Sequence, residues 1–336
     1  MLAIIALALC ASPGSRADLQ CHNDLFSSWS NPAAGDWFDS SNWCGGVPIC
    51  FAITSISNGG TAQIGSGTNA NACETFLGQY QGDPFTCENG RGSSGSLSVD
   101  GGTLHTCSPM HVGYQGKGNL KITNGGLVST NFITDIAVGA DSYGTVTVDG
   151  ASSQLTVTEG PEALYVGGTN GSPGGTGLLT VTSGGKVTAT SVYVYKSGTL
   201  SGNGAINATS GTTVDGTVAP NGGGGTLNFS GALQLSSAAV TQCQVTPHDP
   251  STTPQVSVSG QASLGGRLSV TMTGDFSSAP SRFTLLYADS VDSVHNKFDS
   301  QSITYPTGQG CWVPQLTYDY SGGHVHVYLD RVYNCN

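Results

Sequence analysis

Apolar and polar positions alternate in short segments along the middle of the chain, and the pattern recurs four times between Gly95 and Gly198. In the segment 178–182, Leu179 and Val181 alternate with threonines, a period of two that predicts a strand with one buried face. Each copy has a glycine, such a strand, a turn and two shorter strands, the last ending near Val-Gly. The copies start at Gly95, Gly118, Gly144 and Gly177.

Tight corners are predicted after the first strand of the copies, at Asn124-Gly125, Asp149-Gly150 and Ser183-Gly184. Asn, Asp and Gly tolerate positive φ, so these pairs favour a corner with little strain. The copies lie 23, 26 and 33 residues apart, so the order of elements is constant while the loops vary. This combination is typical of stacked structural repeats.

A single unit cannot shelter its apolar row from water, whereas stacked units bury it in a shared column, with strands roughly 4.8 Å apart. We therefore expect Leu120, Val146 and Leu179 to point into one common interior. About three strands and three corners in each unit predict an all-β fold, a parallel β-helix. The 50 glycines and the frequent Ser, Thr and Asn favour many corners, and no segment indicates a long helix.

The units also share a sequence pattern in which a strand ends in Val-Gly and a Gly-Thr-Leu-like strand follows. Segment 148–154 (VDGASSQ) is a variant of the corner, and 198–204 (GTLSGNG) followed by 225–229 (GTLNF) leads into the last coils. These features resemble the β-helical passenger repeats of bacterial autotransporter-type and related secreted surface proteins, over most of residues 36–330. The resemblance implies a secreted, right-handed parallel β-helix (β-solenoid). Autotransporters end in a membrane barrel, and because no strand series with aromatic girdles stands here, we expect a passenger without one.

Four segments are expected along the chain. Residues 1–17 are apolar and then small, as in a signal peptide cleaved near Ala17, and the apolar stretch is too short to span a membrane. Residues 18–50 are expected to form an N-terminal cap and residues 51–225 the parallel β-helix repeats. In residues 226–336 the strands become longer and more aromatic, which predicts the final coils and a C-terminal β-rich cap that blocks end-to-end aggregation.

Three tryptophans stand in the N-terminal segment: Trp29, Trp37 and Trp43. Bulky rings can plug the open apolar end of the first coil, so the expected role of this segment is an aromatic cap. The alternative is that the three indoles form a platform that stacks on sugars.

Ten cysteines occur, one of them within the expected signal peptide. Their number and the expected export favour disulfides formed in an oxidising compartment. We expect local pairs of Cys44 with Cys50, Cys73 with Cys87, and Cys311 with Cys335, although the spacing leaves the connectivity open. The odd number of mature cysteines leaves either one free thiol or an intermolecular bridge.

The net charge of −11, with ten Lys and Arg residues, argues against binding to nucleic acid or to an anionic membrane. Carboxylates are few in the repeats, and Asp100 and Asp149 occupy the same corner position, which indicates a role in the turn. His324 and His326 share one face of a strand and could bind a metal as a pair, but the sequence shows no third metal ligand for them. We expect no catalytic residues, no metal and no cofactor. The other carboxylates of the repeats are Asp135, Asp141, Glu159 and Glu162.

The sequence therefore predicts a secreted, non-catalytic β-solenoid, an extracellular or cell-surface structural or adhesive protein. Its expected partners are surface glycans or other extracellular polymers, with no membrane span. Two alternatives stay open: a polysaccharide-active β-helix enzyme, either a lyase or a hydrolase, and a self-assembling extracellular fibre subunit. The enzyme requires a groove with carboxylates from neighbouring coils. The unpaired cysteine is the hint for the fibre.

Overall fold

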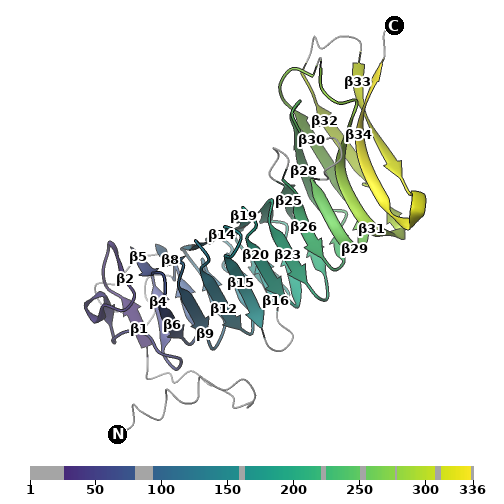
Figure 1. Cartoon of the computed structure of the whole chain (residues 1–336). Coiled ribbons are helices and arrows are strands. Elements are labelled where there is room, and N and C mark those ends of the chain that lie inside the picture. The colour runs from purple at the N-terminus through teal and green to yellow at the C-terminus, as the bar shows by residue number, and fades with distance from the viewer. Residues whose placement is uncertain are drawn as a thin grey trace.

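The computed structural model describes residues 26–79, 94–158, 163–220, 225–249, 255–276, 278–306 and 312–333. These residues form β-strands and two single-turn 3-10 helices, η1 (Ser40–Asn42) and η2 (Ser321–Gly323), with no α-helix. The chain is thus all-β, as predicted, and its strands stack into an elongated body with the N- and C-terminal parts at opposite ends (Figure 1). In the described part of the chain, no helix has the length and apolar character needed to cross a membrane. The expected signal peptide lies outside the described residues.

The first ladder is a parallel sheet of eleven strands, in which each strand pairs with the corresponding strand of the preceding and following unit. Its strands are β2 (Ala34–Asp36), β5 (Asn58–Ile64), β8 (Ser94–Asp100), β11 (Lys117–Thr123), β14 (Tyr143–Asp149), β19 (Thr176–Thr182), β22 (Gly198–Gly202), β25 (Thr217–Pro220), β28 (Val240–Val245), β30 (Arg267–Met272) and β32 (Ser300–Thr304).

Two further parallel ladders run beside it and meet in the long strand β29 (Val256–Leu264), which pairs with the last short strand of each. The second ladder contains β6 (Asn69–Ala72), β9 (Thr103–Thr106), β12 (Leu127–Asn131), β15 (Gln154–Thr158), β20 (Lys186–Ala189), β23 (Ala205–Ala208) and β26 (Leu227–Ser230). The third contains β1 (Phe26–Trp29), β4 (Ile53–Ile56), β7 (Thr75–Leu77), β10 (Met110–Val112), β13 (Thr134–Ile136), β16 (Ala163–Val166), β21 (Ser191–Val194), β24 (Thr212–Val214) and β27 (Leu233–Leu235).

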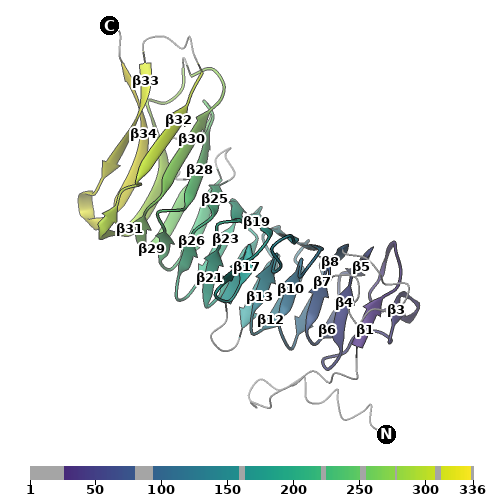
Figure 2. The same ribbon diagram turned by 180° about the vertical axis from the view of Figure 1, so that it is seen from behind.

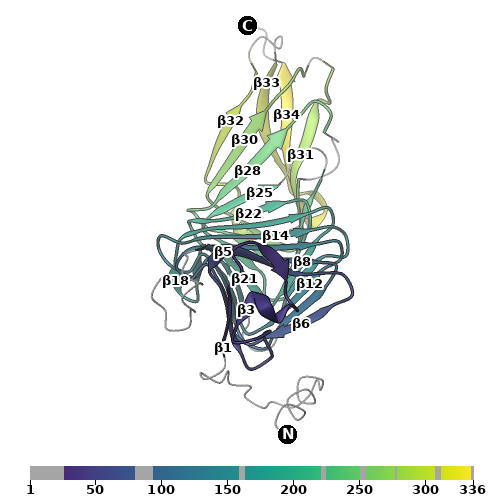
Figure 3. The same cartoon turned by 90° about the vertical axis from the view of Figure 1, so that its left-hand side faces the viewer.

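The chain visits the three ladders in a constant order. After β11 in the first ladder it enters β12 in the second and β13 in the third, and then returns to the first at β14. Viewed along the stack, the strands of the three ladders lie on different sides (Figure 3). Each such passage is called a coil below.

The repeats found in the sequence are stacked in register. Gly118 pairs with Gly95 on one side and with Gly144 on the other, and Gly144 pairs with Gly177. These glycines face inward, and a Cβ on Gly144 would overlap the carbonyl oxygen of Val112, the last residue of β10 in the third ladder. The close approach of two backbone segments therefore requires glycine at this position.

Leu120, Val146 and Leu179 occupy one register column and are fully buried in a single hydrophobic cluster, which confirms their predicted common interior. The predicted corners also have the expected backbone. The φ angles are 52° at Asn124 and 54° at Ser183, and glycines with positive φ follow both residues. Period-two alternation and corner chemistry thus determine the coils together.

A hairpin explains the largest spacing between repeats. Strands β17 (Gly168–Thr169) and β18 (Ser172–Pro173) pair with each other between β16 and β19, and Gly168 also pairs with Ile136 of β13 in an antiparallel bridge. The hairpin adds residues to this coil without shifting the register of the strands on either side. It lies against the third ladder.

The three N-terminal tryptophans pack together in the interior. Trp29 and Trp37 are fully buried and Trp43 is 6% exposed. Trp43 lies in β3 (Trp43–Cys44), which pairs antiparallel with β1, and its ring makes edge contacts with both other indoles at 4.8 Å between centroids. Its Nε1–H donates to the carbonyl oxygen of Trp37 at 2.7 Å. The indoles therefore fill the N-terminal end of the core, and none has an exposed face of the kind that a sugar-stacking platform requires.

Longer strands form the C-terminal end. β31 (Arg282–Asn296) continues the sheet from β29, and β34 (Val325–Tyr333) and β33 (Trp312–Asp319) follow it in antiparallel pairing. Figure 1 shows them as a broad sheet beyond the stack. Pro314 lies in the outermost strand, β33, and lacks the N–H needed to pair with another edge.

One predicted disulfide is wrong. Cys50 bonds to Cys107, 57 residues away, and not to Cys44. The bond is long-range in sequence because Cys50 precedes β4 and Cys107 lies between β9 and β10, and the strands β4 and β10 flank β7 in the third ladder. Cys44 and Cys73 each form a disulfide as well. Cys87, Cys311 and Cys335 lie outside the described residues. Cys243 is a free cysteine within β28 and is buried in the core, so its thiol is not available for an intermolecular bridge.

Candidate functional site

The third ladder contains a column of aromatic and ionisable side chains that point outward. Its members are the central residues of successive strands, and each pairs in register with the next: Phe76, His111, Asp135, Tyr165 and Tyr193. Their neighbours in each strand, such as Met110 and Val112, belong to the hydrophobic core. Because side chains alternate along a strand, the column points away from the core. Figure 2 shows several strands of this ladder side by side.

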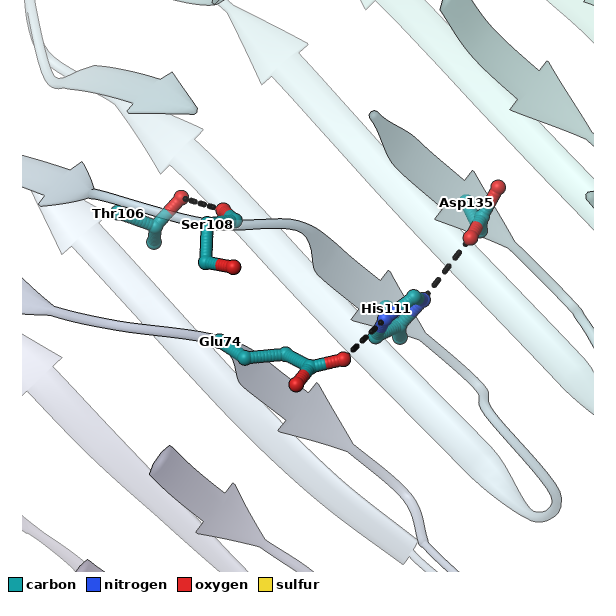
Figure 4. A network of polar contacts seen from close by, with 5 residues as sticks. All are labelled: Glu74, Thr106, Ser108, His111 and Asp135. Atoms are coloured by element: carbon teal, nitrogen blue, oxygen red, sulfur yellow. Dashed lines mark hydrogen bonds and ion pairs between the residues drawn. The ribbon is translucent and has the colours of Figure 1, made fainter. Parts of the chain in front are cut away.

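His111 lies at the centre of a polar network that spans three coils (Figure 4). Its Nδ1 is 2.9 Å from Oδ2 of Asp135, and its Nε2 is 3.1 Å from Oε1 of Glu74. Glu74 directly precedes β7, so the three residues come from three consecutive coils. The network thus connects these coils through side chains in addition to the backbone ladder.

Aromatic rings cover the imidazole. Phe76 stacks on it with 4.8 Å between ring centroids and 25° between planes, and Tyr114 lies at 5.2 Å. As a result His111 is only 7% exposed and Asp135 only 1%, although both point outward from the ladder.

Hydrogen bonding sets the charge of His111. Burial disfavours the charged ring, but the hydrogen bonds to Asp135 and Glu74 outweigh burial and raise the pKa of His111 above its usual value. Below this raised pKa the ring is an imidazolium that donates from both nitrogens to carboxylates. It has no free lone pair, so it cannot accept a proton as a general base. The arrangement is suited to holding coils together. The second carboxylate oxygen of Asp135, Oδ1, has no hydrogen-bond partner among the described residues.

Three tyrosines continue the column. Tyr165 stacks on Tyr193 with 5.4 Å between centroids and 13° between planes, and Tyr195 stacks on Tyr165 at 6.2 Å. The Tyr195 hydroxyl donates to the carbonyl oxygen of Thr169 in the β17–β18 hairpin at 2.7 Å, which fixes the ring. Burial and the neighbouring phenols raise the pKa of Tyr165, so its hydroxyl stays neutral at physiological pH.

The corner aspartates have the structural role predicted for them. Asp100 Oδ1 accepts hydrogen bonds from Thr123 Oγ1 at 2.8 Å and from Asn124 Nδ2 at 2.6 Å, both on the next coil. Asp149 accepts from Thr182 in the same way, and its hydrogen bonds to Ser183 and Thr182 lower its pKa. These carboxylates therefore connect one corner to the next.

The remaining candidates do not gather with the column. His324 and His326 flank the ring of Tyr287 on the C-terminal sheet, where the Tyr287 hydroxyl lies 3.0 Å from His324 Nδ1. No three His, Cys, Asp or Glu side chains gather to hold a metal ion in the part of the chain that the structure describes. Glu159 and Glu162 lie outside the described residues.

Sequence reasoning missed His111, Glu74 and the tyrosines. A usable signal existed, because three strands of the third ladder, β7, β10 and β16, end at a Val-Gly or Leu-Gly pair. Aligning the copies on that pair places Phe76, His111 and Tyr165 directly before it. Aligning the copies on their first strands obscures this column, since the intervening loops differ in length.

No protein-family model matches this chain, and comparison with curated proteins finds no significant match. The function therefore has to be argued from the fold and from the column of the third ladder.

Proposed function

We propose that this chain is a secreted, right-handed parallel β-helix that acts outside the cell as a structural and adhesive rod. The constant order in which the chain visits three parallel ladders supports the β-helix. The eleven strands of the first ladder give a stack roughly 48 Å long at the usual strand spacing. The disulfide between Cys50 and Cys107 supports an oxidising, extracellular location.

The observation on which the adhesive role rests is the aromatic column of the third ladder. Four of its five members, Phe76, His111, Tyr165 and Tyr193, have aromatic side chains, and Asp135 interrupts them in the middle. Of the five, only Tyr193 is well exposed, at 38%, so we expect an extracellular polymer to contact the column at that ring. The rest of the described surface has few charges, and the net charge of −11 disfavours polyanions.

Co-sedimentation tests this function. The full chain is mixed with insoluble extracellular polysaccharides and with whole cell walls, and the bound fraction is measured after centrifugation. We expect the chain to sediment with at least one polymer and to release no soluble product from it. A chain that stays in the supernatant with every polymer would contradict the adhesive role.

A polysaccharide-active enzyme is the second candidate, because Glu74 and Asp135 place two carboxylates on the coils that flank the coil of His111. Both carboxylates are hydrogen-bonded to His111, and Asp135 is buried, so neither is placed to protonate a glycosidic oxygen. We expect no reducing ends and no unsaturated products from polyuronates or bacterial glycans. Formation of either, with loss of the activity in Asp135→Asn, would favour the enzyme.

A further inference from the structure

Tyr193 ends the stack of aromatic rings. One of its faces packs on Tyr165, and no other described ring contacts it. Its side chain is 38% exposed, whereas Tyr165 beneath it is 6% exposed. The next residue in the column is Thr213, which is too small to cover a phenol ring. The ring stack therefore stops with an accessible aromatic side chain in the middle of one side of the molecule.

Beyond Tyr193 the column continues with neutral hydrogen-bonding side chains. Thr213 pairs in register with Gln234, and Gln234 pairs with Ser263. Gln234 is exposed, and Thr213 and Ser263 are half-buried. An aromatic face followed along the same line by hydroxyl and amide groups matches a sugar, which has one apolar C–H face and a rim of hydroxyls. The tyrosine offers dispersion contacts, and the polar residues offer hydrogen bonds.

The charges near this surface favour an uncharged ligand. No Lys or Arg belongs to the column, and the charges of the network of Glu74, His111 and Asp135 sum to a negative value when His111 is protonated. The nearest cation along the chain is Lys196, which follows Tyr195. A nucleic acid or a sulfated glycan needs several cations along its path, which this side does not provide.

We propose that the face of Tyr193, with Thr213 and Gln234 beside it, is a subsite that stacks one ring of a neutral polysaccharide. The proposal rests on the adhesive function above and names its ligand class and its contact residue. The rigid ladder and the stacked Tyr165 hold the Tyr193 ring in place before binding, which reduces the entropy lost when a sugar docks.

Affinity electrophoresis tests the subsite, with gels that contain neutral or anionic soluble polysaccharides. Tyr193→Ala removes the stacking face, and Tyr193→Phe keeps it. Tyr143→Ala is the matched control, because Tyr143 is 42% exposed on the first ladder, away from the column. Lys196→Ala tests dependence on the nearby cation. We expect Tyr193→Ala to weaken binding to a neutral polysaccharide by about tenfold, and Tyr193→Phe, Tyr143→Ala and Lys196→Ala to change it by less than about twofold.

The outcomes separate the two proposals. If the wild-type chain binds a neutral polysaccharide and Tyr193→Ala binds it equally well, the subsite is wrong and the adhesive function stands. Binding only to anionic polysaccharides, or binding lost in Lys196→Ala, would likewise overturn the subsite alone. If no polysaccharide in solution or in the sedimentation assay binds, both proposals fail. Matching circular dichroism of all variants establishes that each is folded.

Discussion

Ala137 adopts a backbone conformation that disfavours its side chain. Its φ angle is 63°, in the left-handed region, and it follows β13 at the position where Gly78, Gly113 and Gly167 end the equivalent strands with φ of 72°, 77° and 81°. A Cβ in this conformation costs about 1–2 kcal/mol. The surrounding ladder holds Ala137 there, since its N–H donates to the carbonyl oxygen of Val112 at 2.8 Å.

We expect Ala137→Gly to raise the free energy of unfolding by about 1 kcal/mol, because glycine adopts this φ without strain. Urea denaturation of the two proteins measures the difference. The matched control is Ala189→Gly in β20, where φ is not positive and glycine should lower the stability by about 0.5–1 kcal/mol. A loss of stability in both variants would contradict strain at Ala137.

The charged state of His111 predicts a pH dependence. The pKa of His111 is raised in the folded state, so its contribution to stability is complete below the unfolded value of about 6.5. That contribution is lost as the pH rises through the folded pKa, because the folded state then releases a proton that the unfolded state has already lost. The groups that face the ring are Glu74, Asp135 and Tyr114.

We therefore expect the stability difference between wild type and His111→Gln to be larger at pH 6 than at pH 9. Urea denaturation at both values measures it, and subtracting the variant removes the titration of other groups. An equal difference at the two pH values, or a larger one at pH 9, would show that the ring is neutral in the fold.

At the scale of the element, the sequence predicted strands and corners well because both follow from local chemistry. Alternation identified the strand around Leu179, and the pair Asn124-Gly125 identified a corner. The sequence did not predict which residues of different coils contact each other. His111 and Asp135 are 24 residues apart, and Cys50 and Cys107 are 57 apart. Contacts of this kind depend on register, which variable loops and the inserted hairpin hide from a comparison along the chain.

The Cys50–Cys107 disulfide is an element-scale constraint on the N-terminal coils. It joins the segment before β4 to the segment after β9, with 57 residues of separation. Closing a loop of that length in the unfolded chain corresponds to about 4 kcal/mol in the chain-entropy model.

We expect the double variant Cys50→Ala and Cys107→Ala to lower the free energy of unfolding by about 2–4 kcal/mol, as measured by urea denaturation. Cys243→Ala is the control, because it removes a buried sulfur without opening a disulfide. A double variant as stable as the wild type would mean that this bond does not constrain the N-terminal coils.

At the scale of the whole molecule, each coil depends on its neighbours. Interior residues such as Leu120 and Val146 are buried only because the next coil covers them, and the same stacking assembles the outward column from Phe76 to Tyr193. The core and the candidate site are therefore two consequences of one register. A shift of the register by one residue would turn the inward side chains of the shifted strands outward. It would therefore disrupt both the core and the candidate site.

Disulfide trapping tests this register most directly. Thr147 and Thr180 are outward residues paired across β14 and β19, whereas Thr182 lies two residues further along β19. Parallel partners are close enough for a disulfide, and diagonal positions, about 7–8 Å apart in a sheet, are much less favourable. After mild oxidation and peptide mapping, we expect a cross-link in the pair Thr147→Cys with Thr180→Cys, and none in Thr147→Cys with Thr182→Cys. A cross-link in the diagonal pair but not in the direct pair would contradict the stacked register.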